Sequence, residues 1–115
     1  MVIAFQSTRA PVSYGSFVVY ASWRQRLQGL LCTSRAHEPI MLSSCHAIHT
    51  WGMSYAIDVV FLSADMRVLQ AYTQVAAGRM LSCAGACAVL ERPAQVAVWP
   101  HAGEQLEGTI WSVAS

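Results

Sequence analysis

Short runs of β-branched, aliphatic and aromatic residues recur along this chain at intervals of about ten residues, the spacing of strands in all-β domains. Polar residues or glycine separate these runs, as turns separate strands. Parallel strands joined by helices need longer gaps, so the spacing favours a sandwich or a small barrel. We expect strands at Phe17–Ala21, Ile40–Leu42, Ala47–Thr50, Ile57–Leu62, Val68–Val75, Ala88–Glu91, Val96–Trp99 and Thr109–Val113.

One segment near the N-terminus has the period of a helix. Its apolar positions Trp23, Leu27, Leu30 and Leu31 share one face. Ser22 stands three residues before a glutamine, which is a capping-box pattern for a helix start. The chain is therefore predicted to be mainly β: a single-domain, jelly-roll-like β sandwich or compact barrel with one short N-terminal helix at about residues 22–32.

The composition limits the class of protein. The 115 residues are 55% hydrophobic and only 11% charged, which excludes an intrinsically disordered chain and fits one domain over residues 1–115. The longest stretch without a charged residue, Pro39–Ile57, contains several Ser, Thr and His residues, so we expect no transmembrane segment. The N-terminus lacks a basic start followed by a long apolar run, so we expect no signal peptide and a cytoplasmic protein.

The basic residues argue against nucleic acid as a partner. All seven are arginines, and they are scattered singly while six acids bring the net charge to +1. Proteins that bind nucleic acid concentrate positive charge to replace counterions on the phosphates. We expect a small ligand or a protein partner instead, and a monomer or weak homodimer, because four tryptophans in so small a chain predict some apolar surface.

The densest group of chemically versatile residues runs from Cys45 to Met53 and includes His49 and Thr50. Thiols and imidazoles are metal ligands, and a thiol beside an imidazole can act as a nucleophile. With the Cys83 and Cys87 pair, a zinc site of Cys45, His49, Cys83 and Cys87 is an alternative, but neither pair has the tight CxxC spacing of zinc knuckles. Buried, reduced cysteines are the default expectation, with a Cys83–Cys87 disulfide only in an oxidising compartment.

Two acids in apolar runs need explanation. Asp58 and Glu91 each lie within or beside a strongly apolar strand, where a carboxylate is buried only if it is paired. Arg79 is the expected partner of Asp58, because a guanidinium can bind both carboxylate oxygens. These three residues form either a structural charge network or the polar floor of a pocket.

The connection after Leu62 is predicted to be a hairpin turn over residues 63–66. It lacks glycine, so a left-handed position would be strained unless Asp65 occupies it. A second turn is expected at Ala102–Gln105.

Several ordered motifs resemble a family catalogued as domain of unknown function 192. They are Arg26–Leu31, Cys45–Met53, Ile57–Leu62, Val89–Ala94 and Gly103–Leu106, and together they cover about residues 17–111. The most specific is His49-Thr50-x-Gly52-Met53 followed by Ile-Asp-Val-Val-Phe. The resemblance implies a compact, mostly β sandwich of jelly-roll type with a short early helix, and it implies no established activity.

The chain departs from the family pattern at several turn and polar positions. The differing residues are Thr33, Ser54, Ala56, Ser63, Met66, Ala77 and Gln95. If the family uses these positions for a pocket, this chain is expected to bind differently.

We therefore predict an uncharacterised, non-enzymatic ligand-binding or assembly module that needs no cofactor. The candidate ligand-binding residues are Cys45, His49, Thr50, Met53, Asp58, Arg79 and Glu91. They are the one concentration of ligand-type and ion-pairing residues in a chain poor in charge. The alternative is a metal-binding or thiol-dependent enzyme that uses Cys45 and His49.

Overall fold

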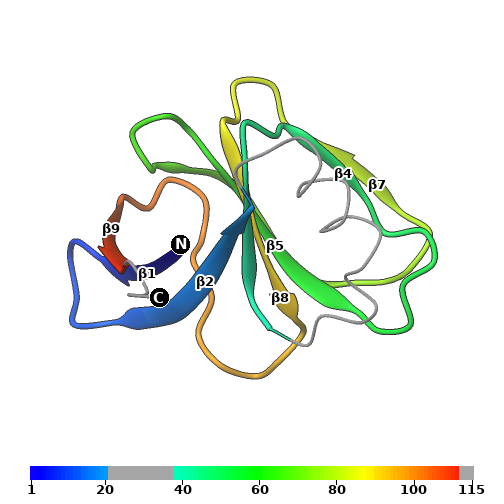
Figure 1. The fold of residues 1–115 in the computed structure, drawn as a ribbon, viewed down its shortest axis with the longest axis horizontal. Helices are drawn as coiled ribbons and strands as arrows, with labels where there is room; N and C mark the ends of the chain where they lie inside the picture. The colour runs from blue at the N-terminus through cyan, green and yellow to red at the C-terminus, as the bar shows by residue number, and fades with distance from the viewer. Residues whose placement is uncertain (21–37, 112–115) are drawn as a thin grey trace.

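A computed structural model describes residues 1–20 and 38–111, and it shows a mainly β, single compact domain (Figure 1). The predicted helix at residues 22–32 lies outside the described residues. The described strands are β1 (Val2–Ser7), β2 (Ser13–Tyr20), β3 (Ile40–Ser43), β4 (Ala47–His49), β5 (Ile57–Leu62), β6 (Val68–Val75), β7 (Met80–Ser82), β8 (Ala88–Pro93) and β9 (Leu106–Trp111). No helix within these two ranges is long and apolar enough to cross a membrane.

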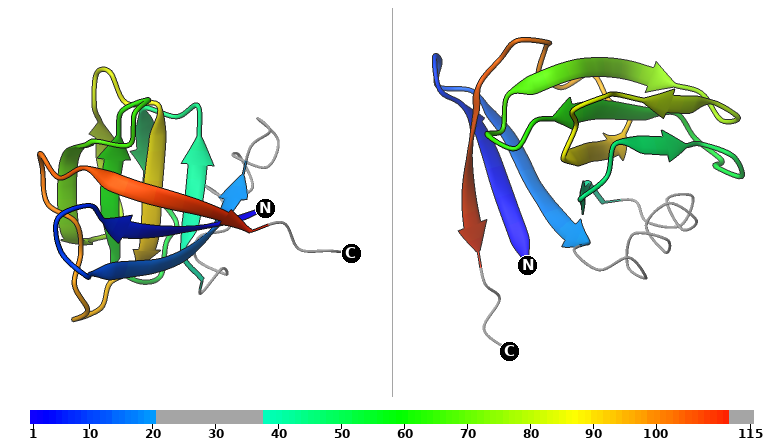
Figure 2. Two further views of the ribbon diagram at one scale, coloured as in Figure 1. Left: turned by 90° about the vertical axis from the view of Figure 1, so that its left-hand side faces the viewer. Right: turned by 90° about the horizontal axis from the view of Figure 1, so that it is seen from above.

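Seven of the strands form one sheet in the order β6-β5-β8-β3-β2-β1-β9. All neighbours in it are antiparallel except β2 and β3. The sheet curls so far that its two edges meet where β6 and β9 begin, through a bridge between Arg67 and Gln105 (Figure 2). The Val68 amide also donates to the Glu104 carbonyl oxygen at 2.8 Å. The result is a half-barrel, which is nearer to the compact-barrel form of our prediction than to two stacked sheets.

Apolar side chains pack on both faces of this sheet. Inside the curl, residues such as Phe5, Phe17 and Leu90 form one core. On the opposite face, a second core that includes Ile40 and Phe61 lies on the side covered by the β4–β7 ribbon (Figure 2). Because both faces are covered, every residue of β5 is buried, which explains its nearly continuous apolar sequence.

The strand predictions for residues 57–62 and 68–75 are confirmed, and those for residues 17–21, 40–42, 47–50, 88–91 and 109–113 locate strands with shifted ends. The predicted strand Val96–Trp99 is wrong. The guanidinium of Arg92 binds the carbonyl oxygens of Ala97 and Val98 at 2.6 and 3.0 Å, so a side chain replaces a neighbouring strand there. The strands β1 and β7 were not predicted.

The hairpin between β5 and β6 is confirmed, but its left-handed residue is Met66, with φ of 66°, and not Asp65. The carboxylate of Asp65 instead accepts a hydrogen bond from the Ser63 hydroxyl within the turn. The second predicted turn is also present, and Gly103 supplies its left-handed position with φ of 90°.

Candidate functional site

Asp58 pairs with Arg92, so the predicted pair of Asp58 and Arg79 is wrong. Asp58 on β5 lies directly opposite Arg92 on β8, and Arg92 Nε donates to Asp58 Oδ2 at 2.8 Å. Both side chains are buried, whereas Arg79 is exposed. The cause is sheet register: directly opposed residues on paired strands meet, and Arg79 precedes β7 in the other sheet.

The Asp58–Arg92 pair is the centre of a structural network. The other oxygen of Asp58 accepts the Gln74 amide at 3.0 Å, where β6 bulges against β5 and Gln74 has φ of 53°. The Arg92 guanidinium lies 4.2 Å from the centre of the Trp99 ring, and the Trp99 indole donates to the Val59 carbonyl oxygen at 3.3 Å. Each of these groups has its partners, so the network holds the fold together.

Cys45 and Met53 belong to the second core and are buried there among apolar residues. Cys83 is buried as well, whereas Cys87 is exposed, contrary to the expectation of buried thiols. No disulfide joins Cys83 to Cys87. Among the residues that the structure describes, no three His, Cys, Asp or Glu side chains are grouped so that they could hold a metal ion, so the zinc alternative of Cys45, His49, Cys83 and Cys87 gains no support.

Thr50 and Arg79 do come together, but through the backbone. The Thr50 hydroxyl donates to the Ala76 carbonyl oxygen at 2.8 Å and accepts from the Arg79 amide at 2.8 Å. Thr50 is buried, so these bonds replace water for three polar groups. Thr50 therefore fixes the loop before β7.

Replacing Thr50 by valine keeps the shape of the side chain and removes both hydrogen bonds. We expect the Thr50→Val variant to lose about 1–3 kcal/mol of unfolding free energy, because two part-buried hydrogen bonds are lost and each contributes about 0.5–1.5 kcal/mol. Urea denaturation measures this loss. Thr50→Ser restores the hydroxyl and should retain more of the stability, and equal losses in both variants would contradict the hydrogen-bond account.

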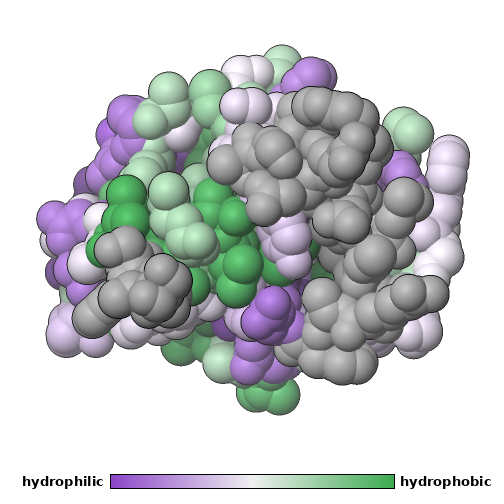
Figure 3. Space-filling model, in the orientation of Figure 1, coloured by the Kyte–Doolittle hydropathy of each residue, from purple (hydrophilic) through white to green (hydrophobic). Residues whose placement is uncertain are grey.

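His49 is half-buried, and its ring lies over Trp51 with a centroid distance of 5.0 Å. Its Nδ1 atom is buried and has no hydrogen-bond partner among the described residues. Trp51 itself is 57% exposed, which agrees with the predicted apolar surface. The space-filling view also shows apolar residues gathered on the side of the molecule where β1, β2 and β9 lie (Figure 3).

Glu91, like His49, has a buried side-chain atom without a partner among the described residues, but its whole side chain is buried. It is only 3% exposed, and its Oε2 atom has no hydrogen-bond partner in the described part of the chain. On β8 its neighbours across the sheet are Ile40 on β3 and Val59 on β5, both apolar. Burial in these surroundings raises the pKa of Glu91 from 4.5 to about 8, so the carboxyl group is protonated at neutral pH.

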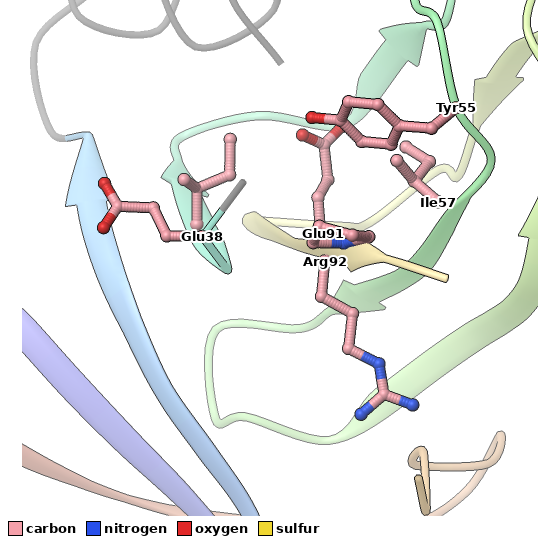
Figure 4. Close-up of a pocket in the computed structure, with 7 residues that line it drawn as sticks. Glu38, Tyr55, Ile57, Glu91 and Arg92 are labelled. Atoms are coloured by element: carbon pink, nitrogen blue, oxygen red, sulfur yellow. The ribbon is translucent and has the colours of Figure 1, made fainter. Parts of the chain in front are cut away.

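A small cavity surrounds the Glu91 carboxyl group (Figure 4). Its volume is about 10 Å³, roughly the space of one water-sized group. Tyr55 presents its hydroxyl beside the Glu91 carboxyl. Burial and, after it, the charge of Glu91 raise the pKa of Tyr55. The lining residues are Glu38, Ile40, Tyr55, Ile57, Glu91, Arg92 and Pro93.

The Glu91 cavity and the Asp58 network lie on opposite faces of β8, because Glu91 and Arg92 are consecutive residues of one strand. Figure 4 shows the Arg92 guanidinium turned away from Glu91. Glu91 and Asp58 therefore belong to different sites, on opposite faces of the sheet. Sequence reasoning missed Arg92 and Tyr55. The one signal in the sequence is that consecutive side chains of a strand point to opposite faces, so Glu91 and Arg92 need separate partners.

A larger cleft of about 460 Å³ lies elsewhere, beside Tyr14, Trp99 and Glu104. Its buried carboxylate is already satisfied: Glu104 accepts hydrogen bonds from the Tyr14 hydroxyl and the His101 amide, and it pairs with the His101 ring at 3.1 Å. Burial and, after it, the hydrogen bond to Glu104 and the charge of Glu104 raise the pKa of Tyr14 to about 12. Each polar group in these contacts has a partner, so Glu91 is the stronger candidate for a ligand-binding group.

Comparisons with known proteins show the fold alone. No protein-family model matches the sequence, and no curated protein matches it. A solved structure from Sinorhizobium meliloti 1021, described as that of a proposed transcription regulator, has a TM-score of 0.71 at 15% identity and covers 93% of this chain and 92% of its own. A protein of unknown function from Novosphingobium aromaticivorans DSM 12444 has a TM-score of 0.66 at 16% identity, with 93% and 84% covered. This chain therefore has the same fold as these two bacterial proteins.

Proposed function

We propose that this protein is a small, non-enzymatic binding module whose ligand places a polar group against Glu91. The observation that carries the proposal is the buried Oε2 atom of Glu91, which has no partner among the described residues. A buried polar atom without a partner costs about 1–3 kcal/mol. A ligand that supplies the missing hydrogen bond recovers this free energy, and the cavity beside Glu91 has room for such a group.

Backbone amide shifts in ¹H–¹⁵N NMR test the proposal. The probes are propylamine hydrochloride, 1-propanol and sodium propionate, which share a tail and differ in the polar group. At least one probe should shift the amides of Tyr55, Ile57 and Glu91 in a saturable way. No saturable shift at these amides with any probe would contradict the proposal.

Two variants localise the effect. Glu91→Gln should weaken the response at least tenfold, because the amide cannot ionise and replaces one of the two oxygens by an NH2 group, which only donates. Arg79→Ala is the matched control, since Arg79 is exposed and outside the cavity. An equal response in the Glu91→Gln variant and the wild type would place the ligand elsewhere.

The alternative function, a metal-dependent or thiol-dependent activity of Cys45 and His49, has one favourable observation, the unpartnered Nδ1 atom of His49. Thiol reactivity provides its test. Because Cys45 and Cys83 are buried and Cys87 is exposed, we expect iodoacetamide to modify Cys87 faster than Cys45 or Cys83. Peptide mass spectrometry after timed labelling measures the three rates. Faster labelling of Cys45 than of Cys87 would favour the thiol-dependent alternative.

A further inference from the structure

The charge around the Glu91 cavity is one-sided. Glu38, Glu91 and Tyr55 belong to its lining, and Figure 4 shows the Glu91 carboxyl and the Tyr55 hydroxyl side by side, with the Glu38 carboxyl turned away from them. The one cationic side chain among its described lining residues belongs to Arg92. That guanidinium points away from the cavity (Figure 4). Every nitrogen of the Arg92 guanidinium has an acceptor on the other face of the sheet: Asp58 for Nε, and the carbonyl oxygens of Val98 and Ala97 for Nη1 and Nη2. The described lining residues therefore present the carboxyl group of Glu91 to the cavity and no available cation.

The walls of the cavity strengthen this preference. Ile40, Ile57 and Pro93 complete the lining, and they are apolar. An attraction between charges is stronger beside apolar side chains than in water. A cation that donates a hydrogen bond would stabilise the ionised form of Glu91 and occupy its open acceptor position, whereas an anion would find no available cationic side chain among the described lining residues.

The cavity volume limits the size of the group that enters. About 10 Å³ accommodates roughly one water-sized group, such as an ammonium nitrogen with its hydrogens. A guanidinium is planar and several times larger. A divalent metal ion is not suited either, because it needs several oxygen ligands, and no group of three or more candidate ligands occurs within residues 1–20 and 38–111.

We propose that the ligand is a primary amine, which binds as its ammonium ion with the nitrogen donating to Oε2 of Glu91 and the organic tail outside the cavity. This inference rests on the proposed function and specifies its ligand class. The proton balance is simple: the Glu91 carboxylic acid gives its proton to the buffer as the ammonium ion enters, so that a carboxylate and an ammonium remain in contact. Tyr55 lies beside the pair and orients the carboxylate.

Proton release distinguishes an ammonium ligand from neutral ligands. Isothermal titration of propylamine hydrochloride in two buffers with different ionisation enthalpies gives the number of protons released. At about pH 6, which is roughly two units below the pKa of Glu91 in the folded protein, we expect close to one proton per bound amine. At about pH 9.5 the carboxylate is already formed and we expect almost none.

The selectivity among the three probes completes the test. Propylammonium should bind at least tenfold more tightly than 1-propanol, and propionate should not bind. Glu91→Gln should abolish proton release, and Tyr55→Phe should weaken binding while release persists. Glu107→Gln is the matched control, because it makes the same change at an exposed carboxylate on β9.

Two results would overturn the inference in different ways. If 1-propanol or propionate binds at Glu91 as tightly as propylammonium, or if the amine binds at about pH 6 without proton release, the ligand class is wrong while the binding function stands. If none of the three probes shifts the amides around Glu91, the proposed function fails as well.

Discussion

Replacing Arg92 by alanine should lower the free energy of unfolding by roughly 3–5 kcal/mol, the cost of leaving a buried charge without its partner. Asp58 would keep its amide contacts but lose the guanidinium at 2.8 Å. The carbonyl oxygens that hold residues 97 and 98 against β8 would lose their donors too. Chemical denaturation followed by tryptophan fluorescence and circular dichroism measures the loss.

Arg79→Ala is the control, because it removes the same side chain from an exposed position. We expect a change within about 0.5 kcal/mol for this variant, as for most surface substitutions. A double variant with Asp58→Asn and Arg92→Met should lose less stability than the two single variants combined, since no unpaired charge remains. Equal losses in Arg92→Ala and Arg79→Ala would contradict the assignment of the ion pair.

Glu91→Gln should make the protein more stable at alkaline pH. The pKa of Glu91 is about 8 in the folded protein against 4.5 for its ordinary value. Between these values the unfolded chain loses the proton while the folded chain keeps it, so rising pH favours unfolding. The wild type should therefore lose on the order of 4 kcal/mol of stability from this group between about pH 4.5 and pH 8, at 1.4 kcal/mol per pKa unit.

The difference between wild type and variant isolates this effect from the other acids. At about pH 4 the two proteins should be similarly stable, and at about pH 9 the Glu91→Gln variant should be the more stable by several kcal/mol. Urea denaturation across this range gives both curves. Glu107→Gln should keep the pH dependence of the wild type. Parallel curves for wild type and Glu91→Gln would mean that Glu91 ionises normally in the folded protein.

The spacing of apolar residues depends only on neighbours in the sequence, and it predicted the strands that carry the two buried acids. Asp58 lies in β5 and Glu91 in β8, within or overlapping runs expected to be strands. The run Val96–Trp99 has the same apolar character, yet it is no strand, because the side chain of Arg92 binds its carbonyl groups. Strand identity in that segment depends on a distant arginine, which periodicity does not detect.

The partners of the buried acids depend on register between strands that are far apart in the sequence. Asp58 and Arg92 are separated by 34 positions and meet because β5 pairs with β8. The same pairing, with that of β3, places Ile40 and Val59 beside Glu91 and leaves its carboxyl group without a charged partner among the described residues. The sequence identified both acids as unusual, and the topology shows that one is structural and the other faces a cavity.

The ionisation of Glu91, measured by ¹³C NMR of its side-chain carboxyl group with and without propylamine hydrochloride, tests the binding site most directly. Without the amine, we expect this carboxyl to titrate with a pKa of about 8. With saturating amine, its pKa should fall by at least about three units, because a bound ammonium ion stabilises the carboxylate and close to one proton is to be released at about pH 6. The same pKa with and without propylamine, 1-propanol and propionate would contradict a ligand-binding role for Glu91.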